Sequence, residues 1–164
     1  MNTTNHNNMG TSRSNGSLYT SIVNGVATVE FGHPASNSFV SELLERLTKT
    51  LVELSNKEEV SVILLKSEGN RAFCAGASFD ELLEVDNLSE GKIFFSGFAH
   101  LINAMRTCKK LIVGRVQGKA VGGGVGIIAA CDYVFAVEAA SIRLSELTIG
   151  IAPLVIAPAV QRKI

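Results

Sequence analysis

The sequence feature that most constrains the fold is the stretch LIVGRVQGKAVGGGVG at residues 111–126. It opens with an apolar run, 111–116, whose β-branched residues are typical of a buried strand. Glycines follow, and behind them the run 125–130 is apolar with short side chains. The stretch therefore predicts a strand, a tight glycine turn and a buried helix, as in an α/β protein.

The start of that helix is the first candidate functional site. A helix N-terminus presents unpaired backbone N–H groups and a partial positive charge, and glycine lets a ligand come close to them. The glycines at 122–124 could therefore bind an anion, or an oxygen that becomes negative during a reaction. They could equally serve only to bring a helix and a strand close together.

A third interpretation of the same stretch is a dinucleotide site. Residues 124–129, GVGIIA, fit the pattern G-x-G-x-x-A behind a strand, and Glu146 follows at about the right distance for the ribose-binding acid. The turn is long for this motif, because residues 118–123 separate it from the strand. Glu146 also follows a second predicted strand instead of ending the first. Both observations speak against a dinucleotide site.

Composition and charge limit the possible classes of protein. The chain has 164 residues, 46% of them hydrophobic, which is enough for one domain with a core. Its 15 acidic and 15 basic residues form no basic cluster, so neither nucleic acid nor a membrane is expected as a partner. No membrane-spanning run and no signal peptide are predicted. Cys74, Cys108 and Cys131 are widely spaced, which indicates reduced cysteines in a cytoplasmic protein and no metal site.

The rest of the chain predicts alternating strands and helices without a sequence repeat. Residues 1–17, rich in Asn, Thr, Ser and Gly, are expected to be disordered, and one domain is expected at 18–164. Asn24-Gly25 between two strand-like runs is a strong hairpin signal. The expected strands are 18–23, 26–31, 60–65, 111–116, 133–137 and 141–144, and the expected helices besides the one after the glycines are 40–55, 79–85 and 89–107.

Two further loops could complete a site. The loop 66–78 follows a strand at its carboxyl end, where open α/β sheets place their ligands. Its segment Ala75-Gly76-Ala77 has minimal side chains, so its backbone N–H groups could be reached. Glu146 adds a carboxylate on a third loop, although a loop carboxylate is often a plain surface residue. His33, beside proline, is more typical of a solvated histidine, and His100, among apolar residues, of a structural one.

Taken in order, four stretches carry a family pattern: residues 72–77 (AFCAGA), 116–124 (VQGKAVGGG), 130–132 (ACD) and 145–151 (SELTIGI). Together they resemble the enoyl-CoA hydratase/isomerase (crotonase) family, and the loop 33–37 (HPASN) looks like the start of that family. The resemblance runs from about Leu18 to the end of the chain. It implies an α/β fold, a spiral of ββα repeats truncated at its C-terminus. It also implies an acyl-CoA thioester as the substrate, with no separate cofactor.

The resemblance implies roles for individual residues. The backbone N–H groups of Ala77 and Gly123 would form an oxyanion hole for the thioester carbonyl, and Glu146 would transfer the proton. The loops around Ala35–Asn37 and Ala75–Ala77 would hold the coenzyme A moiety. The residues expected to contact substrate or coenzyme A are Ala35, Ser36, Asn37, Ala75, Gly76, Ser78 and Gly122.

The chain departs from the family pattern at two positions. Hydratases usually carry a second glutamate two positions after the last glycine of the turn, and here that position is Gly126. One carboxylate suffices to move a proton between two carbons, so Gly126 favours a double-bond isomerase. A branched-chain hydratase, such as a methylglutaconyl-CoA hydratase, stays open. Ser78 stands where many members have an aspartate, which leaves the substrate contacts there open as well.

The length of the chain is a third departure. Family members usually continue with a C-terminal helical region that covers the acyl-CoA site and builds a trimer. This chain alone is therefore expected to expose apolar surface and to associate, and a full-length protein is expected to be a homo-oligomer, a trimer or a dimer of trimers. The alternative function is a non-catalytic acyl-CoA binder or scaffold of the same fold.

Overall fold

A computed structural model of the chain describes residues 15–164. Residues 1–14, most of the tail that is expected to be disordered, lie outside the described residues. Ser17, the last residue assigned to that tail, is the first residue of strand β1 (Ser17–Val23). The strand begins one position earlier than expected because Ser17 pairs with Gly32 of the neighbouring strand.

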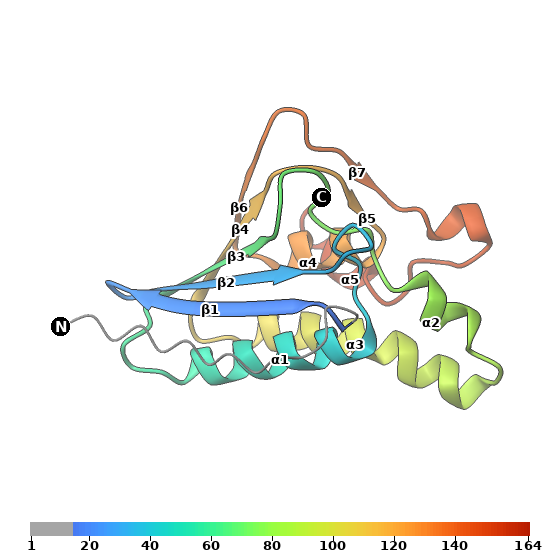
Figure 1. Cartoon of the computed structure of the whole chain (residues 1–164), viewed down its shortest axis with the longest axis horizontal. Helices are drawn as coiled ribbons and strands as arrows, with labels where there is room; N and C mark the ends of the chain where they lie inside the picture. The colour runs from blue at the N-terminus through green and yellow to red at the C-terminus, as the bar shows by residue number, and fades with distance from the viewer. Residues whose placement is uncertain (1–14) are drawn as a thin grey trace.

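Five strands form the main sheet, in the order β1-β2-β3-β4-β6 (Figure 1). β1 and β2 (Val26–Gly32) form the antiparallel hairpin that Asn24-Gly25 predicts, with positive φ at both turn residues (50° and 80°). β3 (Val62–Ser67), β4 (Leu111–Val116) and β6 (Tyr133–Ala136) add in parallel. β3 begins two residues later than expected, because the N–H of Ser61 is bonded to the hairpin turn at Gly25 O (2.8 Å).

After each of the strands β2, β3, β4 and β6, the chain forms a short extended segment, and these segments pair with one another away from the main sheet. In chain order, the paired segments are Phe39 with Ala77, Cys74 with Ala120, and β5 (Ala120–Val121) with β7 (Ile142–Arg143). A helical segment comes after each of them. The described chain therefore contains four turns of one strand–strand–helix unit, which is the spiral that the resemblance implies, although the sequence shows no repeat.

Helices α1 (Ser41–Ser55) and α3 (Leu88–Arg106) lie side by side against one face of the main sheet (Figure 1). α4 (Gly123–Ala130) packs against α3 and against the short α5 (Ala157–Gln161). The α1 leucines at helical spacing are all buried, as expected: Leu43, Leu44, Leu47, Leu51 and Leu54. The remaining helical segments are α2 (Phe79–Leu83), shorter than expected, and η2 (Glu146–Ile149). Within residues 15–164, no helix is both long and apolar enough to cross a bilayer.

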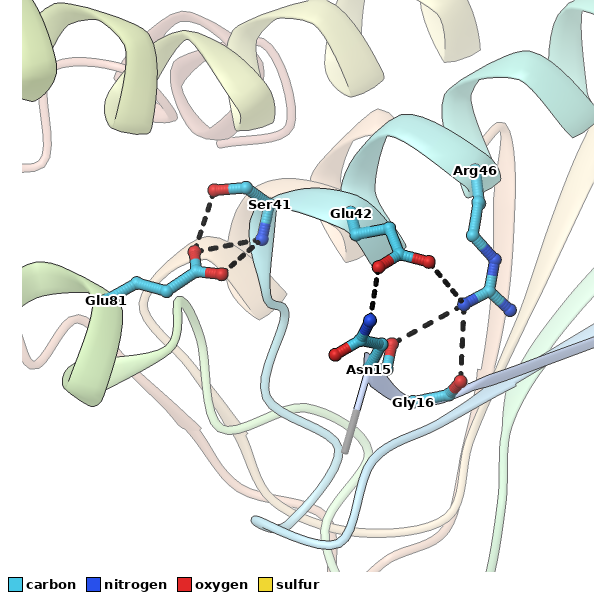
Figure 2. Close-up of polar contacts among 6 residues, drawn as sticks. All are labelled: Asn15, Gly16, Ser41, Glu42, Arg46 and Glu81. Carbon is cyan, nitrogen blue, oxygen red and sulfur yellow. Dashed lines mark hydrogen bonds and ion pairs between the residues drawn. The ribbon is translucent and has the colours of Figure 1, made fainter. Parts of the chain in front are cut away.

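The N-terminus of α1 is capped by a residue from α2. Val40, its N-cap residue, makes no side-chain cap. The carboxylate of Glu81 accepts instead from the N–H of Ser41 (2.9 and 3.1 Å) and from its Oγ (2.7 Å), as Figure 2 shows. The same figure shows Arg46 of α1 donating to the carbonyl oxygen of Gly16 (3.3 Å). The start of α1 is thereby tied both to α2 and to the beginning of the described chain.

Replacing Glu81 with alanine is expected to lower the free energy of unfolding by about 1 kcal/mol, because α1 loses its cap and the negative charge at its N-terminus. Glu84→Ala is the matched control, since Glu84 is exposed at the C-terminal end of α2 and caps that helix only through its backbone N–H, which alanine keeps. It should change stability by less than about 0.5 kcal/mol. Denaturant unfolding of both variants measures the difference, and equal losses would show that the cap does not contribute.

Candidate active site

One pocket is lined by most of the residues that are expected to take part in catalysis or substrate binding. It has a volume of about 200 Å³ and lies between α2, α3, the start of α4 and the segment that follows β7. Figure 1 shows α2 and that segment at the same end of the molecule. The pocket is lined by Ala75, Gly76, Ala77, Gly122, Gly123 and Glu146 from the expected site. Three loops predicted separately therefore meet in one place.

The loop 74–78 leaves one backbone N–H without a partner. The groups around it are bonded within the protein: Ala75 N to Ser36 O (3.2 Å), Gly76 N to Cys74 Sγ (3.3 Å) and Ser78 N to Phe39 O (2.7 Å). Ala77 lines the pocket, and its N–H donates no hydrogen bond among the described residues. Gly76 has φ of +95°, a conformation that favours glycine. The backbone thus leaves the Ala77 amide unbonded within the described residues, in a residue that lines the pocket.

The second unbonded amide belongs to Gly123, the first residue of α4. The first N–H groups of a helix have no intrahelical acceptor, and Gly123 N has none elsewhere in the described chain. Gly122 before it has φ of +53°, and its own N–H binds Arg143 O (3.0 Å). A Cβ on Gly76 would lie 3.7 Å from Gly123 N. The loop 74–78 and the start of α4 therefore lie next to each other.

Glu146 supplies the carboxylate of the pocket. It begins η2, and a Cβ on Gly122 would lie 3.3 Å from its Oε1. Its Oε2 is buried and has no hydrogen-bond partner within residues 15–164. Buried polar atoms are nearly always paired, so an unpaired carboxylate oxygen in a pocket is typical of a site that binds a ligand. Among the lining residues of the described chain, Glu146 is the only ionisable side chain.

The other residues expected to contact coenzyme A lie outside the pocket lining: Ala35, Ser36, Asn37 and Ser78. The side chain of Asn37 is used inside the fold, because its Nδ2 donates to Glu68 O (2.9 Å) and Ala72 O (2.8 Å). Ser78 is the N-cap of α2 and accepts from Glu81 N (3.3 Å). Their contacts with coenzyme A stay predictions. His33 does not line the pocket. His100 is exposed on α3, whereas the sequence predicted a structural histidine among apolar residues.

Sequence reasoning missed the wall of the pocket. Apolar side chains from α2, α3, η2 and the segment 151–156 form it: Phe79, Leu82, Phe94, Phe95, Phe98, Ile149, Ile151, Ala152, Pro153, Val155 and Ile156. The sequence predicts that the aromatic residues of α3 belong to the core, and Phe94 and Phe98 are indeed buried (9% and 6% exposed). They face the pocket as well. Their alignment on one face of a helix was visible in the sequence, but the partner of that face was not.

The dinucleotide interpretation does not match the geometry. β4 ends at Val116 and α4 begins only at Gly123, with β5 of the second sheet between them. In a dinucleotide motif the strand leads directly into the helix. Gly118 has a packing role, because the backbone of Arg71 occupies the space that a Cβ there would need. Gly124 also permits close packing, since its Cβ would lie 2.8 Å from that of Cys74.

Comparison with known proteins gives the family. The model of the family described as enoyl-CoA hydratase/isomerase matches residues 21–164. The match covers most of the chain, so the protein belongs to the enoyl-CoA hydratase/isomerase family. A solved structure of a crotonase family member from Legionella pneumophila superposes with a TM-score of 0.83 at 30% identity, over 92% of this chain and 58% of that one. The crotonase-like fold is thereby confirmed.

Two curated relatives illustrate the range of the family. A short-chain-enoyl-CoA hydratase of Clostridium acetobutylicum is 30% identical over 78% of this chain and 49% of that protein. The mitochondrial methylglutaconyl-CoA hydratase of Rattus norvegicus is 31% identical over 71% of this chain and 37% of that protein. The chain spans about half the length of the curated relatives that it matches first.

The three cysteines are free and differ in their surroundings. Cys74 and Cys131 are buried, and Cys108 is partly exposed. Burial raises the pKa of the Cys74 and Cys131 thiols to about 12. Cys74 nonetheless helps to shape the site, because its Sγ accepts from the N–H of Gly76 (3.3 Å).

Alkylation with iodoacetamide at pH 8 is expected to modify Cys108 alone in the folded protein. The thiolate is the reactive form, and a raised pKa together with burial leaves almost none of it at Cys74 and Cys131. Mass spectrometry of the digested protein assigns the labels. The same treatment in denaturant should modify all three cysteines. Labelling of Cys74 at the native rate of Cys108 would contradict the burial of the loop 74–78.

Proposed function

We propose that the protein moves a proton between two carbons of an enoyl-CoA thioester and so shifts its double bond from position 3 to position 2. The observation that carries the proposal is the buried Oε2 of Glu146, which has no partner among the described residues. An acceptor in this situation is available to take a proton from a substrate. Family membership supports a coenzyme A thioester as the substrate.

In the first step Glu146 takes a proton from C2 of a 3-enoyl thioester. The electrons of the broken C–H bond move toward the thioester carbonyl, and its oxygen becomes negative. The N–H groups of Ala77 and Gly123 donate to that oxygen. A donor of this kind typically contributes about 2.7–4 kcal/mol of transition-state stabilisation, and an apolar surrounding strengthens its effect.

In the second step the protonated Glu146 returns the proton to C4 while the double bond forms between C2 and C3. Substrate and product contain the same atoms, so the reaction consumes no water. One carboxylate is enough for both proton transfers. The pocket fits this requirement, since its described lining holds one carboxylate among apolar side chains.

Glu146→Gln is expected to lower turnover of a 3-enoyl-CoA at least about 100-fold, because the group that carries the proton is lost. Binding of a saturated acyl-CoA should change little, because glutamine has nearly the same shape. Glu138→Gln is the matched control, since Glu138 is exposed and does not line the pocket. Turnover is followed by mass spectrometry and binding by calorimetry.

The products separate the possible functions. Conversion of a 3-enoyl-CoA to the 2-enoyl isomer without a 3-hydroxyacyl product supports the proposal. Formation of 3-hydroxyacyl-CoA from a 2-enoyl-CoA would instead mean hydration, with Glu146 as the only carboxylate that activates the water. Binding without any turnover would contradict an enzyme and favour an acyl-CoA binder.

Gly126, at the position of the second glutamate in hydratases, is enclosed by apolar side chains. A Cβ there would lie 2.5 Å from Cγ2 of Ile156 and 3.0 Å from Cδ1 of Ile102. Both isoleucines are buried (3% and 5% exposed). A longer side chain at 126 therefore has no room until Ile156 is made smaller.

Gly126→Glu is accordingly expected to lower the melting temperature by several degrees and to create no hydratase, because the new side chain overpacks a buried cluster. Gly126→Glu with Ile156→Ala should recover part of that loss, since the second change opens the space. Thermal unfolding monitored by circular dichroism compares the two variants. Equal melting temperatures would show that Ile156 is not what fills this space.

Association of this chain, and a trimer or a dimer of trimers for a full-length protein, stay predictions that exposed apolar residues support. Phe79 and Ile149 line the pocket and are 57% and 53% exposed, and Leu83 and Leu154 nearby in the chain are 71% and 75% exposed. Apolar surface of this kind is typical of a face that is covered by further protein.

A further inference from the structure

Phe98 of α3 packs against Gly123, which carries one of the two amides that are proposed to bind the thioester oxygen. It is 6% exposed and lines the pocket. Its ring occupies the space that a Cβ on Gly123 would need. The ring therefore rests directly on the backbone at the start of α4, and glycine at 123 is what allows it to come so close.

The same ring contacts the residue that holds the other amide. Phe98 and Phe39 form an edge-to-face pair with ring centroids 5.9 Å apart and an interplanar angle of 79°. The backbone of Phe39 brackets Ala77, because Phe39 N donates to Gly76 O (2.8 Å) and Phe39 O accepts from Ser78 N (2.7 Å). A shift of the Phe39 ring would therefore move the backbone next to Ala77.

Phe98 is itself held in place. Its helix lies close against α1, since a Cβ on the neighbouring Gly97 would lie 2.9 Å from Cδ1 of Leu44. Phe39 is supported from behind by Phe31 at 4.7 Å, and Phe31 by Phe73 at 5.5 Å between ring centroids. The ring of Phe98 thus sits between the backbone of Gly123 and the ring of Phe39, with a packed core behind it, and core packing of this density transmits displacements.

We infer that Phe98 is a positioning residue that sets the separation of the Ala77 and Gly123 amides, and so determines how strongly the pair polarises a thioester carbonyl. The inference rests on the proposed function, because it assigns the two amides to one oxygen. It gives Phe98 no part in proton transfer or in binding coenzyme A. Hydrogen-bond donors aimed at a developing charge act only when their geometry is fixed, which is why a packing residue can matter to them.

The first measurement is infrared spectroscopy of bound butyryl-CoA with ¹³C at the thioester carbonyl. Butyryl-CoA is saturated and does not react, so the band reports polarisation alone. In the wild-type protein the bound carbonyl band should lie below its position in water. In Phe98→Leu it should move back toward the free value. Phe94→Leu is the control, because Phe94 lies on the same helix, lines the pocket and contacts Phe95 instead of Phe39.

Kinetics give a second test with the same variants and a 3-enoyl-CoA. Phe98→Leu should lower kcat about 10-fold and change KM less than about 3-fold, since polarisation grows in the transition state. Phe98→Met, whose flexible unbranched side chain can adapt to the gap that the ring leaves, should show the same pattern with a milder loss of stability. Circular dichroism and thermal unfolding verify that each variant is folded.

The outcomes separate the inference from the proposed function. If the carbonyl band of the wild-type complex is not lowered at all, the proposed function fails. If it is lowered, and Phe98→Leu and Phe98→Met leave it unchanged, the positioning role of Phe98 is wrong. An equal shift in Phe94→Leu would also overturn the inference, because any apolar change in the wall would then suffice. A shift confined to the Phe98 variants supports it.

Discussion

The candidate site depends on a few backbone hydrogen bonds that hold the segment 74–78 between its neighbours. On one side the backbone of Phe39 brackets Ala77, and on the other the N–H of Val121 binds Cys74 O (2.9 Å). The segment belongs to the second turn of the spiral, and its partners belong to the first and third. These bonds keep the segments that carry Ala77 and Gly123 side by side, next to the pocket that Glu146 also lines.

The parts of the fold that could be predicted from the sequence are those fixed by local physics. Leucines at helical spacing predicted α1, because this spacing places them all on one face of a helix, which can then be buried. Asn24-Gly25 gave the hairpin because few other residue pairs tolerate positive φ at two consecutive positions. Glu146 and the glycine loops could be selected because their order along the chain resembles a family, and the structure then brings them to one pocket.

The remaining features depend on partners that are far away in the sequence. β5 has two residues, too few for a hydrophobic period, and it exists because Ala120 pairs with Cys74 and Ile142. The cap of α1 comes from Glu81, 40 residues from the Ser41 that it binds. The aromatic face of α3 could be recognised as buried, but nothing local says that it borders a pocket on one side and Phe39 on the other.

Helix α4 shows how little of a site needs to come from its own side chains. Three of its glycines are each covered from a different element: Gly123 by Phe98, Gly124 by Cys74 and Gly126 by Ile156. The helix contributes backbone N–H groups, and side chains of neighbouring elements form the surface around them. The N–H groups and the surrounding surface therefore depend on different positions in the sequence. Substitutions in α3 away from Phe98, or in the segment 151–156, can therefore change the wall of the pocket without changing the residues that carry the two amides.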